Sequence, residues 1–489
     1  MHIVHIAPEM APFVKIGGLG DVVGALPPAQ ARDGHQVTVV LPGYARVLGA
    51  LGLAGQMGQP VSYRVDGYEV GGTVHTIEHH GVTVLLVAQA DFFGRPEVYG
   101  GPEGGYLDNG LRFGWFSGAA LSALRGREPA PDAVVAHDWP AALSPVFQRA
   151  HRMPNDPLER TASAVVIHNL AHQGVFPFEL ARRFSLPHET LHPGALESLG
   201  WLNYLKGAIA YATTVITVSP NYAQEILWGG YSEGLEQTLR ARAEDLVGIL
   251  NGVDTEAWDP AHDVHLARRY DAGDLAGKLE NKLALQRELG LREDPRLPLF
   301  SMIGRLDHQK GVDLLEAAAP GLVDREAQVV LLGAGPQRLV DPLIGLSRIW
   351  RQSVAIVRRF DDPLAHRIYA GSDFFLMPSR FEPCGLGQMI ALRYGTIPIV
   401  RRTGGLVDTV RDIDEHPATG NGFVFNHADA NGLAWACGRA LRALRDRPEL
   451  LAGMQRRAME EDHSWDRSAR TYDEVLEQAV QKERQRTTV

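Results

Sequence analysis

Short runs of apolar residues, each followed by a turn residue and then a helical pattern, recur along the chain. The runs are four to seven residues long and rich in Val, Ile and Leu, which is typical of strands buried on both faces of a parallel sheet. They lie at residues 2–7, 36–41, 83–88, 133–136, 164–168 and 213–218 and, in a second series, at 298–303, 328–332, 354–357, 374–377 and 397–400. Helical patterns separate them, for example at 20–33, 115–125, 361–371 and 386–394. The alternation predicts α/β domains with doubly wound sheets.

The two series of strands are separated by a turn signal, Asn251-Gly252-Val253-Asp254. The chain of 489 residues also exceeds the roughly 250–300 residues at which a single core stops growing. We therefore expect two Rossmann-like domains, residues 1–250 and 251–464, which face each other across a deep cleft at the carboxyl ends of their strands.

Three further segments have a recognisable character. Residues 255–296 are polar and predicted to be helical, and residues 66–110 have the glycine and histidine content of a loop-bearing insertion. The last stretch, 465–489, is helical and highly charged, and we expect it to pack back on the first domain.

The composition, with 45% hydrophobic and 22% charged residues, is that of an ordinary globular protein. A formal net charge of −10 argues against nucleic acid or an anionic membrane as the main partner, although local cations could still bind an anionic small molecule. Two cysteines, Cys384 and Cys437, exclude a disulfide framework and favour a reducing compartment. The sequence shows neither a signal peptide nor a membrane-length apolar run, so we predict a cytoplasmic protein.

The loop after the first strand combines a cation with paired glycines, Lys15-Ile16-Gly17-Gly18. Gly17 and Gly18 would let backbone N–H groups approach a ligand, and the helix that follows favours an anion at its start. A tight turn with an exposed lysine is the plainer alternative. A dinucleotide-binding dehydrogenase is disfavoured, because the glycines do not have the G-x-G-x-x-G spacing and the second strand ends without an acidic residue.

Two later strands of the first half also end in polar residues. His137-Asp138-Trp139 follows the strand at 133–136, and His168-Asn169 ends the strand at 164–168. Either one alone is explained by a capping aspartate or a histidine satisfied within the core. Their occurrence at equivalent strand ends favours a polar site that includes Asp138 and His168.

Three strand ends of the second half carry cations beside glycines. The loop Gly304–Gly311 contains Arg305 and Lys310, and the loop Ser379–Gly387 contains Arg380 and Glu382. The third carries Arg401 and Arg402, followed by Thr403-Gly404-Gly405. Such loops, aimed at one cleft, indicate a diphosphate site in which arginine and lysine grip the anion and a carboxylate grips sugar hydroxyls.

No metal or other cofactor is predicted. Asp412-Ile413-Asp414 is the one D-x-D string, and its position after a helix rather than at a strand end indicates surface charge. No cluster of cysteine and histidine has the spacing of a zinc site. Cys384 is interpreted as a small buried residue and not as a nucleophile.

Taken together, these blocks resemble those of bacterial glycogen synthases and plant starch synthases, in the same order. The matching segments run from residue 1 to about residue 410, and their combination is far more specific than any single glycine loop. They are Lys15-x-Gly17-Gly18-Leu19, Asp108-Asn109-x-x-Arg112-Phe113, His137-Asp138-Trp139, His168-Asn169-Leu170, Asn251-Gly252-Val253-Asp254, Gly304–Gly311, Arg380–Leu386 and Arg402–Leu406.

The resemblance implies a GT-B fold and metal-independent, retaining transfer of glucose from ADP-glucose to the non-reducing end of an α-1,4-glucan such as glycogen. It implies catalytic roles for Arg305, Lys310, Glu382, Asp138 and His168, with Arg305 and Lys310 stabilising the leaving diphosphate. The residues that it implies for binding of the nucleotide sugar are Lys15, Gly17, Gly18, Phe360, Cys384, Gly385, Leu386, Thr403 and Gly404. Among these, Phe360 would stack on the base.

Some positions depart from the family pattern. Pro140, His172 and Gln388 stand where the family commonly has other residues, and Phe360 stands where a tyrosine is expected. No charged catalytic position is lost, but donor-base preference stays open, so UDP-glucose remains the alternative donor. Residues 66–107 diverge, and no acceptor contacts are assigned there.

Other functions remain to be weighed. Another GT-B enzyme, either a transferase to a small acceptor or a nucleotide-sugar epimerase, would share most of these motifs. A non-catalytic glucan-binding protein would be expected to lack Arg305, Lys310 or Glu382, and all three are present. The oligomeric state is not predicted.

Overall fold

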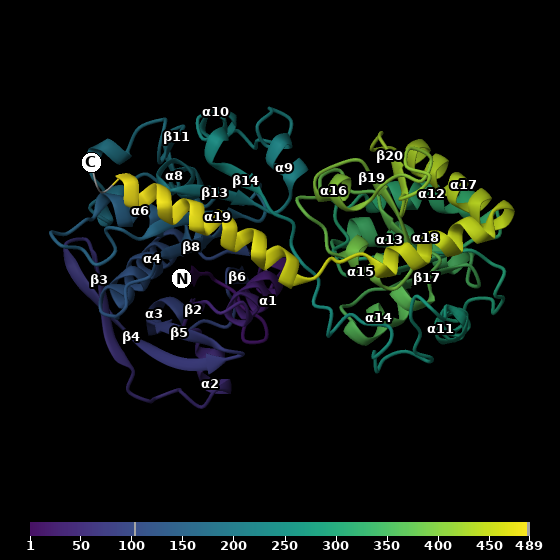
Figure 1. Ribbon diagram of the computed structural model, residues 1–489, viewed down its shortest axis with the longest axis horizontal. Helices are drawn as coiled ribbons and strands as arrows, with labels where there is room; N and C mark the ends of the chain where they lie inside the picture. Colours follow the sequence, from purple (N-terminus) through teal and green to yellow (C-terminus); the bar gives the residue numbers. More distant parts are fainter. Residues whose placement is uncertain (102–103, 487–489) are drawn as a thin grey trace. The chain divides into compact units, whose positions relative to one another are not determined.

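The computed structural model describes residues 1–101 and 104–486. The chain forms two compact units, each with its own central sheet (Figure 1). Unit 1 consists of Met1–Gly252 together with the C-terminal helix α19 (Trp465–Arg486), and unit 2 consists of Val253–Ser464. Within the described residues, no helix has both the length and the apolar character that crossing a membrane requires.

Unit 1 is built on a nine-stranded sheet in the order β14-β13-β9-β8-β1-β2-β5-β4-β3. The first seven strands of this order pair in parallel, and β4 and β3 extend the sheet as an antiparallel edge. The bounds are β1 (His2–Ile6), β2 (Gln36–Pro42), β3 (Gln59–Val65), β4 (Tyr68–His79), β5 (Val82–Ala88), β8 (Ala133–His137), β9 (Ala162–Ile167), β13 (Thr214–Thr217) and β14 (Leu246–Gly248).

Helices cover the sheet of unit 1, so its central strands are buried along their whole length. Helix α19 packs against α1 and β9, which places the end of the chain on its first unit (Figure 1). The helices are α1 (Gly18–Arg32), α2 (Ala45–Ala50), α3 (Ala90–Phe93), α4 (Asn109–Arg125), α5 (Asp138–Ala141), α6 (Leu143–Ala150), α7 (Leu180–Arg183), α8 (Tyr204–Tyr211), α9 (Pro220–Glu225) and α10 (Glu236–Arg240). The short strands are β6 (Gly100–Gly101), β7 (Gly104–Gly105), β10 (Val175–Pro177), β11 (Glu197–Ser198) and β12 (Trp201–Asn203).

Unit 2 has a six-stranded, entirely parallel sheet in the order β17-β16-β15-β18-β19-β20. Its strands are β15 (Leu299–Ile303), β16 (Gln328–Leu332), β17 (Val354–Val357), β18 (Phe374–Met377), β19 (Ile397–Arg401) and β20 (Phe423–Phe425). Its helices are α11 (Ala276–Glu288), α12 (Val312–Val323), α13 (Gln337–Ile349), α14 (Asp362–Gly371), α15 (Gly387–Arg393), α16 (Gly405–Thr409), α17 (Ala430–Asp446) and α18 (Pro448–Glu460). Apolar side chains from the strands and from α12, α13 and α17 form its core.

The predicted α/β class and both series of strands are confirmed, within one or two residues at each end. The prediction for residues 255–296 is wrong for the most part, because only Ala276–Glu288 is helical and the preceding residues form turns. Residues 66–110 are also more regular than a loop-bearing insertion, since β4 is twelve residues long and pairs with β5. Of the two segments 66–110 and 465–489, residues 102–103 and 487–489 lie outside the described residues.

The prediction that the Asp412-Ile413-Asp414 string is surface charge is wrong for Asp412, although the Asp414 side chain is 65% exposed. Asp412 is buried and receives the guanidinium of Arg439 on α17, with contacts of 2.5 and 2.9 Å, while the more exposed Asp414 receives the same guanidinium at 2.6 Å. Asp412 also accepts the backbone N–H of Val424 at 2.6 Å. The pattern of charges could not show this, because the partner lies 27 residues away along the chain.

This buried ion pair predicts a large loss of stability when one partner is removed. Arg439→Ala leaves Asp412 in the core without its counter-ion, and we expect it to lower the free energy of unfolding by about 3–5 kcal/mol. Denaturation in urea measures the loss. Arg445→Ala on the same helix is the matched control, because Arg445 is exposed and pairs with Asp446, so its midpoint should stay at that of the wild type. Equal midpoints for the two variants would contradict a structural role for the buried pair.

The same site predicts how stability changes with pH. Burial alone would raise the pKa of Asp412, but the bonds from Arg439, Val424 and Asp414 outweigh it and hold the pKa below its ordinary 3.8. Because the folded-state pKa is lowered, the stabilisation is present above about pH 4 and is lost as pH falls through the folded-state pKa. We expect the stability difference between wild type and Asp412→Asn to be full near neutral pH and to narrow below pH ~4. A difference that stays constant down to acid unfolding would refute this assignment.

Candidate active site

The sheet of each unit has one point at which the strand order reverses, so that successive strands are added on opposite sides of it. Doubly wound sheets bind their ligands at this point. In unit 1 the chain proceeds from β1 to β2 and β5 on one side and from β8 to β9 and β13 on the other. In unit 2 the reversal falls between β15 and β18. The strands at the two reversal points are β1 and β8 in unit 1 and β15 and β18 in unit 2. The segments that follow them contain four of the five predicted catalytic residues, namely Asp138, Arg305, Lys310 and Glu382. The fifth, His168, follows the neighbouring strand β9.

The two loops at the reversal of unit 2 are joined through Lys310 and Glu382. Nζ of Lys310 lies 2.5 Å from Oε2 of Glu382, and the Ser379 hydroxyl donates to the same oxygen at 3.1 Å. The backbone N–H of Arg380 donates to the carbonyl of Gln309 at 2.7 Å. The structure therefore brings together the predicted cation and carboxylate, and burial of Glu382 makes their pairing necessary.

Arg305 and Phe360 lie at the same edge of the unit 2 sheet but remain open to solvent. The side chain of Arg305 is 57% exposed, and its contacts with Gln309 and Asp307 are long, at 3.4 and 3.5 Å. Phe360 follows β17 and is 76% exposed. A guanidinium and an aromatic face are thus both accessible to a ligand at the carboxyl ends of β15 and β17.

The loop between β18 and α15 owes its shape to close backbone contacts. Gly404 has a φ of 46°, and a Cβ there would lie 1.8 Å from the carbonyl oxygen of Glu382, so only glycine fits. Gly385 also has a positive φ, of 77°. Thr403 and Cys384 are buried, and Leu386 caps α15. The Gly405 N–H also donates to the carbonyl of Glu382 at 3.1 Å, so the loop after β19 supports the backbone of Glu382.

The cations of the third strand end are used within the protein, contrary to the prediction that they face a diphosphate. Arg401 is buried and donates to the carbonyls of Ser379 and Arg380, so it braces the loop that carries Glu382. Arg402 pairs with Glu415 at 2.5 Å and donates to Asn426. These partners come from the loop after β18, from the segment between α16 and β20, and from the residue after β20, so the pattern along β19 could not reveal them.

In unit 1, the loop after β1 has an internal anion that the sequence analysis did not single out. Glu9 is buried, and its Oε2 accepts the N–H groups of Ile16 and Gly17 at 2.5 and 3.1 Å. Lys15 pairs with Asp21 at 2.7 Å. We expected the Gly17 N–H and Lys15 to bind a ligand, but here both have partners within the protein. The signal that could have identified Glu9 is an acidic residue three positions after a buried strand.

Gly17 and Gly18 are nevertheless exposed, and neither is needed for the packing of the protein itself. A Cβ at either position would meet no atom within 4 Å, and neither residue has a positive φ. The space above them is open, which permits close approach of another molecule.

A second layer of side chains holds this loop. The Tyr99 hydroxyl donates to Glu9 at 2.6 Å. The carbonyl of Tyr99 accepts from Asn109 at 2.8 Å, and Asn109 in turn accepts from the fully buried Arg112 at 2.8 Å. Arg112 also donates to the carbonyls of Phe92 and Val98. The Asp108–Phe113 block therefore holds Tyr99 in place, and Tyr99 in turn binds Glu9 of the loop after β1.

Asp138 and His168 meet at the carboxyl ends of β8 and β9. Oδ1 of Asp138 accepts the backbone N–H of His168 at 2.8 Å, and Asp138 itself has a φ of 53°. Burial raises the pKa of Asp138 to about 7 and lowers the pKa of His168 to about 3, so the imidazole is neutral near pH 7. The structure thus places the predicted pair of unit 1 in direct contact.

His168 is also the end of a row of three histidines. Nε2 of His168 lies 3.0 Å from Nδ1 of His137, and Nε2 of His137 lies 2.9 Å from Nδ1 of His5. Nε2 of His5 lies 2.7 Å from Oε1 of Gln30. His5 and His137 are fully buried in β1 and β8. Two imidazoles that are fully buried in these strands need such partners.

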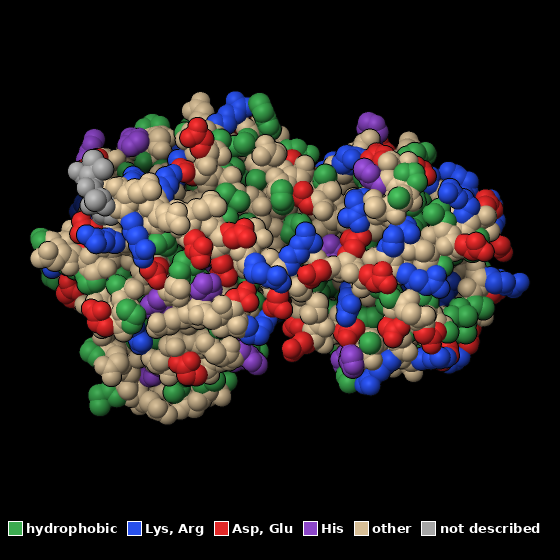
Figure 2. Space-filling view, in the orientation of Figure 1, with side chains coloured by type: hydrophobic (Ala, Val, Ile, Leu, Met, Phe, Trp, Pro, Cys, Tyr) green, Lys and Arg blue, Asp and Glu red, His purple; other side chains and the backbone are tan. Residues whose placement is uncertain are grey.

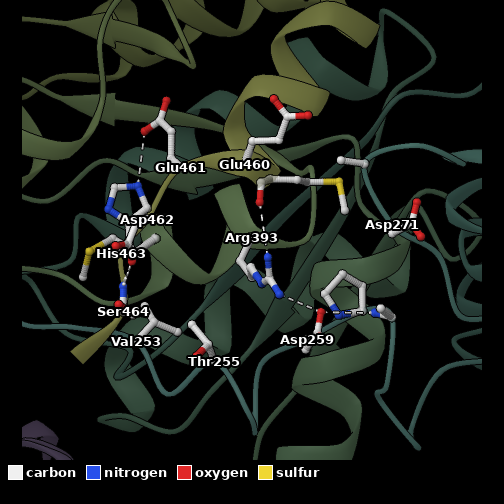
Figure 3. Close-up of a pocket in the computed structure, with 15 residues that line it drawn as sticks. Val253, Thr255, Asp259, Asp271, Arg393, Glu460, Glu461, Asp462, His463 and Ser464 are labelled. Atoms are coloured by element: carbon white, nitrogen blue, oxygen red, sulfur yellow. Dashed lines mark hydrogen bonds and ion pairs between the residues drawn. The ribbon is translucent and has the colours of Figure 1, made fainter. Parts of the chain in front are cut away.

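The pocket drawn in Figure 3 lies elsewhere in unit 2. Its volume is about 570 Å³, and acidic side chains and Arg393 line it between residues 253–272 and 459–464, where the chain enters and leaves the unit. Arg393 joins the two segments by bonds to Asp259 at 2.8 Å and to the carbonyl of Met459 at 3.3 Å. No predicted site residue lines this pocket.

On the face shown in Figure 2, acidic and basic side chains are interspersed.

Comparison with known families gives two matches. Residues 2–241 match the starch synthase catalytic domain, and residues 298–443 match the glycosyl transferases of group 1. Among curated proteins, glycogen synthase 2 of Geobacter sulfurreducens is 42% identical over 98% of this chain and 99% of its own length. Glycogen synthase of Bacillus subtilis is 39% identical over 98% of both chains.

Solved structures give the same result. The catalytic domain of starch synthase IV from Arabidopsis thaliana, bound to ADP and acarbose, superposes with a TM-score of 0.87 at 36% identity, covering 98% of this chain and 99% of that one. Sucrose-phosphate synthase from Thermosynechococcus elongatus, with a TM-score of 0.60 at 18% identity and 98% coverage of both chains, shares the fold alone. The chain therefore belongs to the glycogen and starch synthase family: it is a glycosyltransferase of GT-B fold with glycogen synthase function.

Proposed function

We propose that this enzyme transfers glucose from ADP-glucose to the non-reducing end of an α-1,4-glucan, with retention at the anomeric carbon and without a metal ion. The observation that carries the proposal is the joined pair of loops at the reversal point of unit 2, with Arg305 open to solvent and Lys310 held against Glu382. The related starch synthase IV domain is bound to ADP, which is the leaving group of ADP-glucose.

The cations of unit 2 act on the leaving diphosphate in this proposal. As the bond between the anomeric carbon and the phosphate oxygen breaks, negative charge develops on that oxygen, and Arg305 and Lys310 stabilise it. Glu382 keeps Lys310 in place and offers its remaining carboxylate oxygen to a sugar hydroxyl. Phe360 offers its exposed ring to the base of the nucleotide.

Unit 1 contributes the groups that bind the glucosyl residue. Asp138 and His168 are held by their mutual hydrogen bond at adjacent strand ends. Gly17 and Gly18 leave open space for the nucleotide sugar to approach the loop after β1. Lys15 exchanges Asp21 for phosphate in this scheme, since both partners are partly exposed and a surface pair is weak.

Retention follows from attack on the same face of the sugar from which the leaving group departs. The acceptor O4 forms the new bond to the anomeric carbon, the bond to the phosphate oxygen breaks, and the O4 proton passes to that oxygen. A double displacement would instead need a carboxylate nucleophile. Glu382 has another role in this proposal, because Lys310 and Ser379 hold its Oε2 and its other oxygen binds a sugar hydroxyl.

The reaction compartment proposed is the cytoplasm. Both cysteines, Cys384 and Cys437, are buried and form no disulfide, and burial raises the pKa of the Cys437 thiol to about 12. Such thiols are typical of proteins in a reducing environment.

The proposal predicts metal-independent incorporation of labelled glucose from ADP-glucose into glycogen. We expect Arg305→Ala to lower kcat by about 100-fold or more, because one preorganised cation is lost at the developing charge. The assay contains a chelator and is repeated with UDP-glucose. Arg442→Ala removes an exposed cation from the same unit and should retain wild-type rates. Transfer from UDP-glucose alone would replace the proposed donor, and transfer from neither would refute the proposal.

A second prediction concerns the open space at Gly18. Gly18→Ala meets no atom of the protein and lies at the start of a helix, so we expect thermal stability to be unchanged or slightly raised. We expect kcat/KM for ADP-glucose to fall about tenfold or more, because the methyl group displaces the ligand.

Gly404→Ala is the contrasting variant for this prediction. Its Cβ would collide with the carbonyl of Glu382, so it should lower the melting temperature. If Gly18→Ala lowered stability instead of activity, the glycine would serve the fold and not the ligand.

A further inference from the structure

The row of histidines that ends at His168 does not stop at Gln30. Nε2 of Gln30 donates to Oδ1 of Asp473 at 2.8 Å, and Asp473 lies on the C-terminal helix α19, 443 residues along the chain from Gln30. Gln30 is fully buried on α1, and Asp473 is 8% exposed. A continuous chain of hydrogen bonds thus joins a carboxylate of α19 to the histidine at the end of β9.

The Asp473 carboxylate determines which way the amide of Gln30 points. Burial raises the pKa of Asp473 above its ordinary 3.8, while the contacts with Gln30 and His35 oppose that rise and favour the ionised form. The oxygens of an ionised carboxylate only accept hydrogen bonds, so the Gln30 atom 2.8 Å away must be the NH₂ group. The other oxygen of Asp473 receives Nε2 of His35 at 3.2 Å. The reversed amide would place two oxygens in repulsive contact, so Oε1 of Gln30 faces His5.

The orientation of the Gln30 amide then determines which nitrogen carries the proton in each successive imidazole. Burial lowers the pKa of His5 to about 4 and of His137 well below its ordinary value, so both rings are neutral and carry one N–H each. His5 must donate from Nε2 to Gln30, which leaves its Nδ1 as an acceptor. His137 therefore donates from Nε2, and His168 does the same in turn.

At the end of this chain, His168 is left with one nitrogen for a ligand. Its Nε2 is used by His137, and within residues 1–101 and 104–486 no hydrogen-bond partner of its Nδ1 is found. His168 is partly exposed at the carboxyl end of β9. In this tautomer Nδ1 bears no proton, so it accepts a hydrogen bond from a donor and repels the lone pairs of other acceptors.

We propose that Asp473 is a positioning residue for the transfer reaction: through Gln30, His5 and His137 it fixes the tautomer of His168, whose Nδ1 accepts a hydrogen bond from a hydroxyl of the glucosyl group. The inference rests on the proposed function, in which His168 binds that group. Without a fixed amide at Gln30, the row of rings would have two equivalent proton arrangements, and the second would present an N–H to the sugar hydroxyl.

The arrangement of protons can be tested on the wild-type enzyme without any activity measurement. Neutron diffraction from a deuterium-exchanged crystal near pH 7 should show deuterium on Nε2, and none on Nδ1, of His5, His137 and His168. Deuterium on Nδ1 of any of the three would overturn the proposal. This result holds whether or not ADP-glucose is the donor, so it separates failure of the inference from failure of the proposed function.

A variant that reverses the direction of the hydrogen bonds from Gln30 to His168 tests their effect on the reaction. Lysine only donates hydrogen bonds, so in Gln30→Lys the ammonium group pairs with Asp473 and forces His5 to accept at Nε2. His5, His137 and His168 must then all take the other tautomer. His168 is left with an N–H at Nδ1. We expect kcat/KM for the nucleotide sugar to fall about tenfold or more, because a site built to accept from a hydroxyl now opposes it. The inhibition constant of ADP, which lacks the glucosyl group, should not change.

The matched control is Gln478→Lys. Gln478 is exposed on the same helix as Asp473, and the variant adds the same charge to unit 1 without contact with the histidines. It should keep the wild-type kcat/KM within about twofold. Equal rates for Gln30→Lys and Gln478→Lys would overturn the proposal.

Donor analogues distinguish a change at His168 from general damage to the unit. ADP-glucose analogues that lack one glucosyl hydroxyl at a time are compared in wild type and in Gln30→Lys. For the analogue that lacks the hydroxyl bound by His168, we expect the two enzymes to have equal kcat/KM. If the loss in Gln30→Lys were the same for every analogue, the effect would be structural, and the proposed role of Asp473 would be refuted.

Discussion

Parallel pairing of strands is the constraint on which the rest of this structure depends. In each unit it brings the carboxyl ends of the central strands to one edge, so loops far apart in sequence meet there. It also requires helices on both faces, so the strands are buried throughout and any polar residue in them needs an internal partner. The Lys310–Glu382 pair is a product of the first requirement, and the row from His5 to His168 is a product of the second.

The loops at these strand ends contain more charge than a ligand would need, and much of it is neutralised inside the protein. Glu9 takes the N–H groups of the loop after β1, and Arg401 holds the carbonyls of the loop that carries Glu382. Such internal partners keep the backbone of each loop in one conformation. The groups that remain accessible include the guanidinium of Arg305, the ring of Phe360 and the space above two glycines. Rigid loops with few open groups suit a site that must hold developing charge without rearrangement.

The elements of the fold could be predicted because each depends on local pattern. Continuous apolar runs identify β17 and β18, and glycine beside a cation identifies the loops at Lys15 and Lys310. The partners of charged residues could not be predicted in the same way. Arg439 reaches Asp412 across 27 residues and Gln30 reaches Asp473 across 443, and nothing in either local segment indicates the other. Glu9 was missed for a related reason, since its partners are backbone N–H groups that only the turn of the loop brings near.

The return of α19 to unit 1 has a consequence for synthesis of the protein. Tyr472 and Leu476 of this helix are fully buried in unit 1, yet the ribosome makes them after all of unit 2. Unit 2 is contiguous in the chain and can complete its core while unit 1 still lacks a covering helix over α1 and β9. The unit begun first is therefore finished last, and its apolar surface stays uncovered until the final turns of helix leave the exit tunnel.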